Sequence, residues 1–232
     1  MDKINAIIPA AGQGKRMGGS LNKQFMILQG MSVIEHTLRV FTAIEVISGI
    51  VIVCAAGEED YYQTEILPKY GLIKPIEVVA GGRERQDSVY CGLSAACENC
   101  KHVIIHDGAR PLVTADVIFR AVREVKGYGA LTTGVPVKDT IKRTDSQGVV
   151  IDTLQRQGLW HIQTPQAFRL DLLMRAHEEA RAVGFYGTDD AALVERLGFP
   201  VRVIPGSYEN IKITTPEDLT VAETILRGRG KH

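Results

Sequence analysis

A loop of small and basic residues near the start of the chain has the composition of a phosphate-binding site. Small residues dominate the segment from Pro9 to Gly14, and Lys15, Arg16 and Lys23 follow it without a local acid. Small residues let backbone amides approach an anion closely, and clustered cations then neutralise it. The loop therefore predicts a polyphosphate site, and the alternative is a solvated basic turn.

Two named phosphate-binding motifs do not match this loop. A Walker A loop needs Ser or Thr after the Gly-Lys pair, and Arg16 follows Lys15 here. The dinucleotide fingerprint needs a third glycine three residues after Gly14, where this chain has Met17. The loop is thus expected to bind phosphates in another way.

A second candidate is the carboxylate of Asp107, which follows an apolar stretch of strand length in the run from His106 to Pro111. Magnesium takes one or two carboxylates together with substrate phosphates, so Asp107 is a candidate metal ligand. The alternative is that Asp107 caps the next turn or pairs with Arg110. No second ligand stands near His106, and this histidine is expected to pack or to form hydrogen bonds, as are His161 and His177.

The elements that must position these residues alternate between strand-like and helix-like patterns. Apolar runs predict strands at Ile4 to Ile8, Gly49 to Cys54, Ile76 to Val79, His102 to Ile105 and Ala130 to Val135. Amphipathic patterns predict helices at about 34–43, 58–69, 86–97 and 114–125. Apolar strands that alternate with helices indicate a doubly wound α/β fold of the Rossmann-like kind, with a mostly parallel sheet covered on both faces. Ligands bind such folds beyond the carboxyl ends of the strands.

The alternation breaks after Pro136, where the pattern predicts a protruding β-hairpin arm over 137–158. Its strands are expected at Lys138 to Thr144 and Val149 to Leu154, and both are too polar to bury a face. A lone hairpin is marginal in water, so the arm is expected to pack on its own domain or on a second subunit. We interpret residues 1–232 as one domain with this arm as a dimerisation subdomain.

Beyond Trp160 the chain is expected to return to helices. The predicted elements are helices at about 170–183 and 188–196, a strand from Val201 to Ile204 and a last helix beginning at Thr215.

Composition excludes several classes of protein. The 232 residues carry 27 Lys plus Arg against 27 Asp plus Glu, which argues against a nucleic-acid coat or a polybasic membrane anchor. No signal peptide and no long apolar run is visible, so a cytoplasmic protein without a membrane segment is expected. Cys97 and Cys100 fall at an expected helix end without a second metal-binding pair, and all four cysteines are predicted to be free thiols.

Four stretches of the chain together resemble a known family. They are Ala10-Ala11-Gly12-x-Gly14-x-Arg16-Met17 with Lys23-Gln24, Gly81-Gly82 with Arg85 and Ser88, His106 through Pro111, and Leu159-Trp160 with Gln163-Thr164-Pro165-Gln166. The first stretch is similar to the signature of sugar and polyol phosphate nucleotidyltransferases. All four together resemble the 2-C-methyl-D-erythritol 4-phosphate cytidylyltransferases of the non-mevalonate isoprenoid pathway, in order, from residue 4 to about residue 225.

The resemblance implies that the phosphate of methylerythritol phosphate attacks the α-phosphorus of CTP and releases pyrophosphate, with Mg²⁺ as cofactor. It implies that Arg16 and Lys23 neutralise the developing charge. For nucleotide binding it implies Ala10, Ala11, Gly12, Gly14, Gly82 and Ser88. For acceptor binding it implies Asp107, Arg110, Thr140, Arg156, Thr188 and Lys212. It also points to a homodimer in which Thr140 and Arg156 complete the neighbouring site.

Two positions depart from the family pattern, and two other functions stay open. Asn22 stands where the family often has proline, and Arg83 stands where some members have an acid beside the base. We interpret Arg83 and Arg85 as solvated. The nearest alternative function is a cytidylyltransferase for ribitol 5-phosphate or another polyol or sugar phosphate. The other is a non-catalytic nucleotide-binding module.

Overall fold

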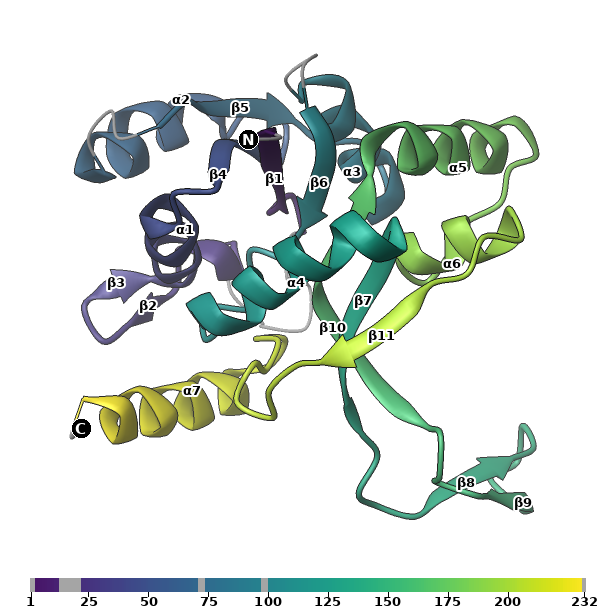
Figure 1. Ribbon diagram of the computed structural model, residues 1–232. Coiled ribbons are helices and arrows are strands. Elements are labelled where there is room, and N and C mark those ends of the chain that lie inside the picture. Colours follow the sequence, from purple (N-terminus) through teal and green to yellow (C-terminus); the bar gives the residue numbers. More distant parts are fainter. Residues whose placement is uncertain (1–2, 13–21, 71–73, 97–99, 231–232) are drawn as a thin grey trace.

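The structure is a computed structural model that describes residues 3–12, 22–70, 74–96 and 100–230. Its centre is a seven-stranded sheet in the order β11-β7-β10-β6-β1-β4-β5 (Figure 1). The strands are β1 (Lys3–Pro9), β4 (Ile47–Cys54), β5 (Ile76–Ala80), β6 (Cys100–Ile105), β7 (Ala130–Pro136), β10 (Trp160–Arg169) and β11 (Arg202–Pro205). All neighbours pair in parallel except β10, which runs antiparallel to both β6 and β7.

Helices cover both faces of this sheet, as the doubly wound α/β prediction requires. Apolar side chains of α1 (Val33–Ala43) and α4 (Ala115–Tyr128) form one buried cluster with the strands. On the opposite face, α3 (Arg85–Ser94), α5 (Leu170–Ala182) and α6 (Asp190–Arg196) form a second cluster. The fold class predicted from sequence is confirmed.

Local signals in the sequence set the ends of several helices. Ser32 and Glu35 form a capping box at the start of α1. Gly129, with φ of 77°, ends α4, because a left-handed conformation there suits glycine. The last helix, α7 (Pro216–Arg229), begins after Thr215 as predicted. It packs on β2 (Ile27–Leu28), which pairs with β3 (Met31–Ser32), through a third apolar cluster.

Strand β10 corrects the prediction that the chain returns directly to helices beyond Trp160. Trp160–Arg169 forms a strand between β6 and β7 in the middle of the sheet. Its residues are mostly polar from Gln163 to Gln166, which hides the strand pattern, and the pairing with β7 shifts register between these two residues. Polar side chains therefore occupy the sheet beside Asp107, whose N–H donates to Oγ1 of Thr164.

Two smaller predictions also need correction. The helix expected at 58–69 is three short pieces, α2 (Glu59–Tyr61), a π turn at Tyr62–Ile66 and a 3-10 turn at Leu67–Tyr70. Cys100 begins strand β6 rather than ending a helix, and Cys97 lies outside the described residues. The three cysteines that the structure describes, Cys54, Cys91 and Cys100, are free, as predicted.

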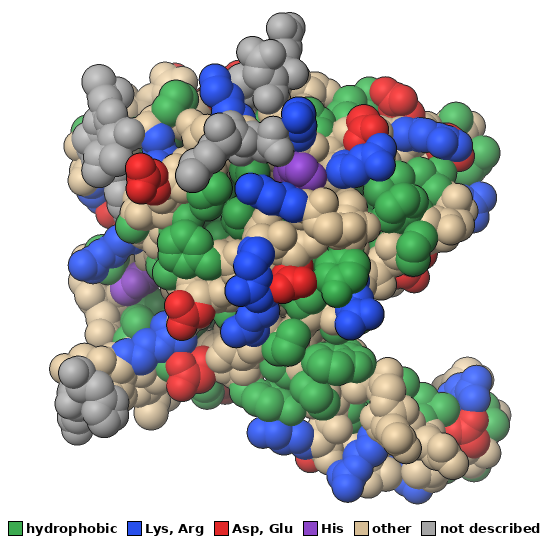
Figure 2. All heavy atoms as spheres, viewed as in Figure 1, with side chains coloured by type: hydrophobic (Ala, Val, Ile, Leu, Met, Phe, Trp, Pro, Cys, Tyr) green, Lys and Arg blue, Asp and Glu red, His purple; other side chains and the backbone are tan. Residues whose placement is uncertain are grey.

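The arm is a separate two-stranded sheet of β8 (Ile141–Thr144) and β9 (Val150–Leu154). It projects away from the main sheet beyond β7 and β10 (Figure 1). Figure 2 shows it as a lobe below the body, with hydrophobic side chains gathered at its root. Trp160 and Ile162 there are 36% and 40% exposed. In the part of the chain that the structure describes, no helix is long and apolar enough to cross a membrane.

Candidate active site

A cavity of about 200 Å³ lies at the edge of the sheet where β1, β5 and β6 end. Parallel strands bring their carboxyl ends to one edge, so loops that are far apart in sequence meet there. The cavity is lined by Pro9, Ala11, Gly12, Lys23, Gln24, Gly82, Arg83, Glu84, Arg85, Ser88, Asp107, Ala109 and Lys212.

The two glycines after β5 leave no space for a side chain. A Cβ on Gly81 would lie 2.6 Å from Oγ of Ser88, and a Cβ on Gly82 would collide with the side chain of Asp87. The Ser88 hydroxyl is buried and donates to the carbonyl of Glu84 at 3.1 Å. Bare backbone at Gly82 and a fixed hydroxyl at Ser88 thus form one wall of the cavity, suited to close contact with a flat ligand.

Lys23 lies on a short 3-10 helix, η2 (Lys23–Phe25), on another side of the cavity. Asn22 caps this helix, because its side chain accepts from the backbone N–H of Gln24 at 3.2 Å. The Asn22 amide donates to both carboxylate oxygens of Glu58, at 3.1 and 3.3 Å. Asn22 therefore fixes the backbone next to Lys23 to the turn after β4.

Asp107 lies at the centre of a cluster of cations. Its Oδ2 accepts from Nζ of Lys212 at 2.7 Å and lies 3.8 Å from Nε of Arg110. Its Oδ1 accepts from Nε of Arg85 at 3.1 Å. The backbone N–H of Asp107 donates to Oγ1 of Thr164 at 3.0 Å. Both carboxylate oxygens of Asp107 therefore have cationic partners, and the residue is only 7% exposed.

Burial and charge act on the pKa of Asp107 in opposite directions. Burial raises the pKa, but Arg85, Lys212 and Arg110 outweigh it and hold the pKa far below its usual range. Three cations, Arg85, Arg110 and Lys212, face two carboxylates, Asp107 and Asp190, so one positive charge is left in excess. The cavity is thus prepared for anionic groups, while Asp107 stays an ionised hydrogen-bond acceptor.

Arg85 corrects the prediction that it is solvated. Besides Asp107 it contacts Asp190, with Nη1 donating to Oδ2 at 2.9 Å. Asp190 also lies 3.2 Å from Nε2 of His177, which is fully buried. Sequence reasoning missed Asp190, and the signal that could have found it was the acidic pair Asp189-Asp190 after Thr188 at the start of a predicted helix.

Of the three histidines that the sequence predicts to pack or form hydrogen bonds, two are fully buried. His106 is fully buried, 3.1 Å from Oγ1 of Thr164 through Nδ1 and 3.1 Å from the carbonyl of Arg110 through Nε2. His106 and His177 therefore pack and form hydrogen bonds as predicted. His161 is exposed on β10.

The residues around Asp107 do not fit a metal site formed by the protein alone. Both carboxylate oxygens are occupied by cations. Among the described residues, no group of three His, Cys, Asp or Glu side chains could hold a metal ion. A divalent cation here would need the phosphate oxygens of a substrate as ligands.

Comparison with known proteins identifies the family. The model of the 2-C-methyl-D-erythritol 4-phosphate cytidylyltransferase family matches residues 4–228. The chain belongs to this family. Enzymes of that name from Pelotomaculum thermopropionicum and Bacillus licheniformis are both 49% identical, over 99% and 97% of this chain and 96% of each relative.

Solved structures of family members agree with the fold. The crystal structure of 4-diphosphocytidyl-2C-methyl-D-erythritol synthase from Anaerococcus prevotii has a TM-score of 0.86 and 34% identity, and covers 97% of this chain and 99% of its own. The 2-C-methyl-D-erythritol 4-phosphate cytidylyltransferase from Thermus thermophilus has a TM-score of 0.81 and 32% identity, over 98% and 100% of the two chains. The sequence resemblance to this cytidylyltransferase family is confirmed.

For a cytidylyltransferase site, the structure brings most of the predicted nucleotide residues together. Ala11, Gly12, Lys23, Gly82 and Ser88 all line the cavity. Ala10 is buried behind them and donates from its N–H to the carbonyl of Val53 at 2.7 Å. Gly14 and Arg16 lie outside the described residues.

The predicted acceptor residues of the cytidylyltransferase fall into three groups. Asp107, Arg110 and Lys212 are together in the cation cluster. Thr188 lines a second cavity of about 490 Å³, which shares Arg83, Glu84 and Arg85 with the first. Within the described chain, Thr140 and Arg156 line neither of these two cavities.

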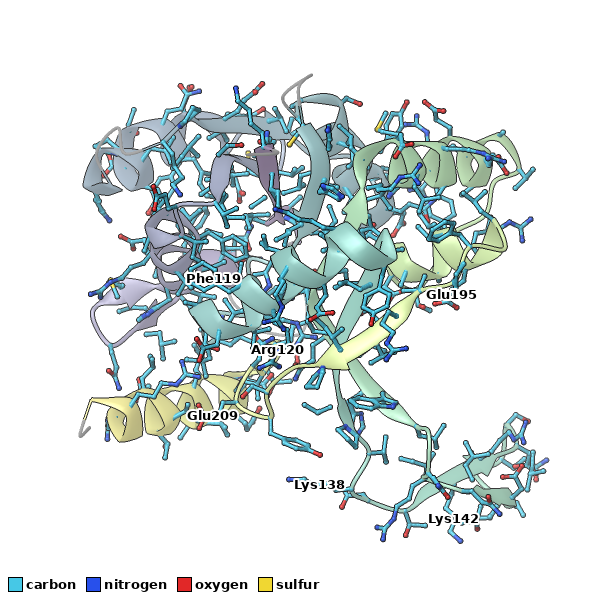
Figure 3. All side chains as sticks on the ribbon, viewed as in Figure 1. Phe119, Arg120, Lys138, Lys142, Glu195 and Glu209 are labelled. Carbon is cyan, nitrogen blue, oxygen red and sulfur yellow. The ribbon has the colours of Figure 1, made fainter. Side chains whose placement is uncertain are left out.

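The positions of Thr140 and Arg156 follow from the arm. Both are exposed, and Nη1 of Arg156 donates to the carbonyl of Lys138 at 2.6 Å. Lys138 lies at the root of the arm and Lys142 farther out along it (Figure 3). The described chain therefore does not bring Thr140 and Arg156 to its own cation cluster.

Proposed function

We propose that the chain transfers CMP from CTP to 2-C-methyl-D-erythritol 4-phosphate, forming 4-diphosphocytidyl-2-C-methyl-D-erythritol and pyrophosphate. The observation that carries this proposal is the joint cavity. Gly82 and Ser88 form one wall, Lys23 another and the Asp107 cluster a third, in a chain that belongs to this family. Together with the adjoining cavity of about 490 Å³, this cavity offers groups suited to a base, a triphosphate and a phosphorylated acceptor.

In this reaction an acceptor phosphate oxygen forms a bond to the α-phosphorus of CTP. The bond from the α-phosphorus to the oxygen bridging it to the β-phosphorus breaks, and pyrophosphate takes that electron pair. The attacking phosphate is already ionised, so it needs neither a covalent intermediate nor a strong general base. Catalysis then consists of positioning and charge neutralisation, for which Lys23 and Arg16 have the right chemistry.

The Asp107 cluster suits the acceptor. An ionised carboxylate accepts hydrogen bonds from hydroxyl groups, and the surrounding cations attract the acceptor phosphate. Lys212 is bound directly to Asp107 and also lines the cavity. Thr188, in the adjoining cavity, extends this region.

A requirement for Mg²⁺ stays a prediction, with triphosphate oxygens as the main ligands. When bound, the ion would neutralise charge on the triphosphate. The predicted role of Asp107 as a ligand is tested by Asp107→Asn. If Asp107 is a ligand, the variant needs more Mg²⁺ for half-maximal activity. An unchanged metal dependence with a raised KM for the acceptor would assign Asp107 to acceptor binding alone.

The homodimer is also part of the proposal. The arm carries exposed apolar side chains at Val149, Val150 and Ile151, with exposed fractions from 52% to 62%. A two-stranded sheet is marginal alone, and a two-fold related copy is the commonest partner among soluble oligomers. Packed in this way, the arm would carry Thr140 and Arg156 to the neighbour's acceptor site.

One assay tests the activity. The protein is incubated with Mg²⁺, each nucleoside triphosphate and a panel of polyol phosphates, and pyrophosphate is measured. We expect the fastest release with CTP and methylerythritol phosphate. A preference for ribitol 5-phosphate would move the assignment to the alternative substrate, and binding of CTP without release from any acceptor would indicate the non-catalytic module. The predicted cytoplasmic location is tested separately by cell fractionation.

A further inference from the structure

The guanidinium of Arg85 joins two buried carboxylates from different parts of the chain. Its Nε donates to Asp107 at 3.1 Å and its Nη1 to Asp190 at 2.9 Å. Asp107 follows β6, whereas Asp190 begins α6, and their exposed fractions are 7% and 1%. Because the guanidinium is planar and rigid, it fixes the distance between these two carboxylates.

Asp190 is itself held from behind. One carboxylate oxygen accepts from Arg85, and the other lies 3.2 Å from Nε2 of His177 on α5. Burial raises the pKa of Asp190, but Arg85 and His177 outweigh it and keep the pKa below its usual value. Asp190 is therefore an ionised anchor that cannot rotate without losing one of its two partners.

A neighbouring pair of hydrogen bonds ties the same elements together. Nε2 of Gln86 donates to the carbonyl of Phe185 at 2.9 Å, and its Oε1 accepts from the N–H of Gly187 at 2.9 Å. The start of α3, which carries Arg85, is thus fixed to the segment before α6. Arg85 approaches Asp107 from a rigid base rather than from a solvated loop.

We propose that Arg85 is a positioning residue for the acceptor, with Asp190 and His177 as its buried anchor. Arg85 holds Oδ1 of Asp107, while Lys212 and Arg110 hold Oδ2, so the carboxylate keeps one orientation toward the cavity. The inference rests on the proposed function, which assigns Asp107 to acceptor binding. It adds a line of side chains, His177, Asp190 and Arg85, that fixes the orientation of the acceptor-binding carboxylate of Asp107.

Charge and geometry predict opposite effects of replacing Asp190. Asp190→Asn removes a negative charge and leaves the cluster more positive, which by itself favours an anionic acceptor. It also weakens the hold on Arg85 and lets Asp107 turn. A loss of kcat/KM for the acceptor would therefore come from geometry.

The test is a double-mutant cycle in the full-length protein. Asp190→Asn is measured in the wild-type background and in an Asp107→Asn background, with methylerythritol phosphate as the varied substrate. We expect kcat/KM for the acceptor to fall about tenfold in the first background and less than about twofold in the second, as for residues that act as one unit. The dissociation constant of CTP should stay within about twofold of the wild-type value in both.

Controls separate this role from general stability. Arg175→Lys alters an exposed ion pair with Glu179 on the helix that carries His177, and should change neither constant. Arg85→Lys keeps the charge but loses the two-sided contact, and should give the same loss of kcat/KM. It replaces Asp190→Asn in the test if the Asp190→Asn protein does not fold. An equal loss in both backgrounds, or no loss in the wild-type background, would overturn the proposal.

A crystal structure of the Asp190→Asn variant keeps the two proposals distinguishable. If the wild-type protein does not use methylerythritol phosphate, the proposed substrate is wrong, and the variant structure still decides the role of Arg85. We expect the Arg85 Nε to Asp107 Oδ1 distance to lengthen well beyond 3.1 Å. An unchanged contact would show that Asp190 does not position Arg85.

Discussion

Lys23 is the described cation most closely associated with the glycine loop. Its Cε lies 4.0 Å from where a Cβ on Gly12 would be, so the side chain passes over the loop beside the cavity. Its backbone belongs to a single 3-10 turn. Removal of the side chain should therefore change the charge in the cavity with little effect on packing.

We expect Lys23→Ala to lower kcat by roughly 10²–10³, as for the loss of one donor that stabilises developing charge. The same is expected of Arg16→Ala. Lys126→Ala, at an exposed position on α4, serves as the control and should keep wild-type turnover. Steady-state kinetics measures kcat of each variant, and thermal unfolding checks that its stability is unchanged. A Lys23→Ala enzyme with wild-type kcat would remove this residue from the mechanism.

His106 gives the second prediction, on stability. Burial lowers the pKa of this histidine to about 4 from its ordinary value of 6.5. The unfolded chain therefore binds a proton more readily than the folded protein between pH 6.5 and 4. The contribution of neutral His106 to the free energy of unfolding is therefore fully present above pH 6.5. It is lost progressively as the pH falls from 6.5 toward 4.

The expected loss at His106 between pH 7.5 and 5 is roughly 2 kcal/mol of unfolding free energy. Urea unfolding at the two pH values measures it, and His106→Gln should remove most of the difference. Asp107 and Asp190 have lowered pKa values, so their contribution is present above the ordinary carboxyl pKa and is lost only at more acidic pH. An equal pH dependence in the wild type and His106→Gln would show that another group is responsible.

At the scale of elements, short irregular pieces position the side chains of the site. The helix η2 is only three residues long and cannot be stable alone. Phe25 packs against Tyr61 and Tyr62 with ring centroids 4.6 and 5.4 Å apart, and Asn22 bonds to Glu58. The turn after β4 therefore supports the turn that carries Lys23.

We expect Asn22→Ala to lower kcat about fivefold, since loss of the cap of η2 costs about 1 kcal/mol. Glu58→Gln should lower kcat less, because the glutamine oxygen can still accept from the Asn22 amide. The matched control is Glu59→Gln. Glu59 accepts from the N–H of Gly57 at 2.6 Å in the same turn and should leave kcat unchanged. If Glu59→Gln lowers kcat as much as Glu58→Gln, the effect comes from the turn as a whole and not from the bond to Asn22.

The sequence predicted the elements that follow simple periodic patterns. Strands such as β1 are apolar on both faces and are visible as runs of Ile, Val and Ala. Strand β10 was missed because polar side chains carry its centre. Those side chains have distant partners, with Gln163 bonded to Ser207 and Gln166 to Thr132 and Asp189. Only the folded structure shows that these polar groups are satisfied inside a sheet.

The residues of the site also divide into those that a local pattern predicts and those that only the fold brings together. Gly82 and Asp107 lie directly after strands, where the rule for parallel sheets predicts a ligand, and Lys23 lies on η2 beside the same cavity. The family resemblance supplied Thr188 and Lys212. The contact of Arg85 with Asp190 joins residues 105 positions apart, and no local pattern indicates such a pair. Contacts between distant charges were therefore beyond prediction from one sequence.

At the scale of the whole molecule, the arm and the site are linked by the segment after β11. Tyr208 donates to the carbonyl of Pro136 at 2.7 Å and lies beneath Nζ of Lys138, 3.5 Å from the ring centroid. Four residues later, Lys212 binds Asp107. One segment thus contacts both the root of the arm and the cation cluster.

The proposed dimer predicts complementation between inactive subunits. Mixing Lys23→Ala with Arg156→Ala protein should, after subunit exchange, restore about a quarter of wild-type activity, because half the dimers are mixed and one of their two sites is intact. Mixing Lys23→Ala with Asp107→Asn is the control and should restore nothing, since both residues belong to the same subunit's share of the site. The shared site would be refuted if light scattering shows only monomer, or if the mixtures stay inactive after subunit exchange.

The ladder between β7 and β10 is already closed at the base of the arm. Trp160 pairs with Pro136, and the N–H of Val137 donates to the carbonyl of Leu159 at 3.0 Å. The arm is therefore an insertion into a hairpin that could close with a short turn, and its length adds little to the cost of closing that loop. Such an insertion can diverge, shorten or be exchanged between relatives while the nucleotide cavity stays as it is. Nucleotide binding is thus free to evolve apart from assembly, whereas acceptor binding, which in the proposed dimer uses Thr140 and Arg156, stays coupled to the arm.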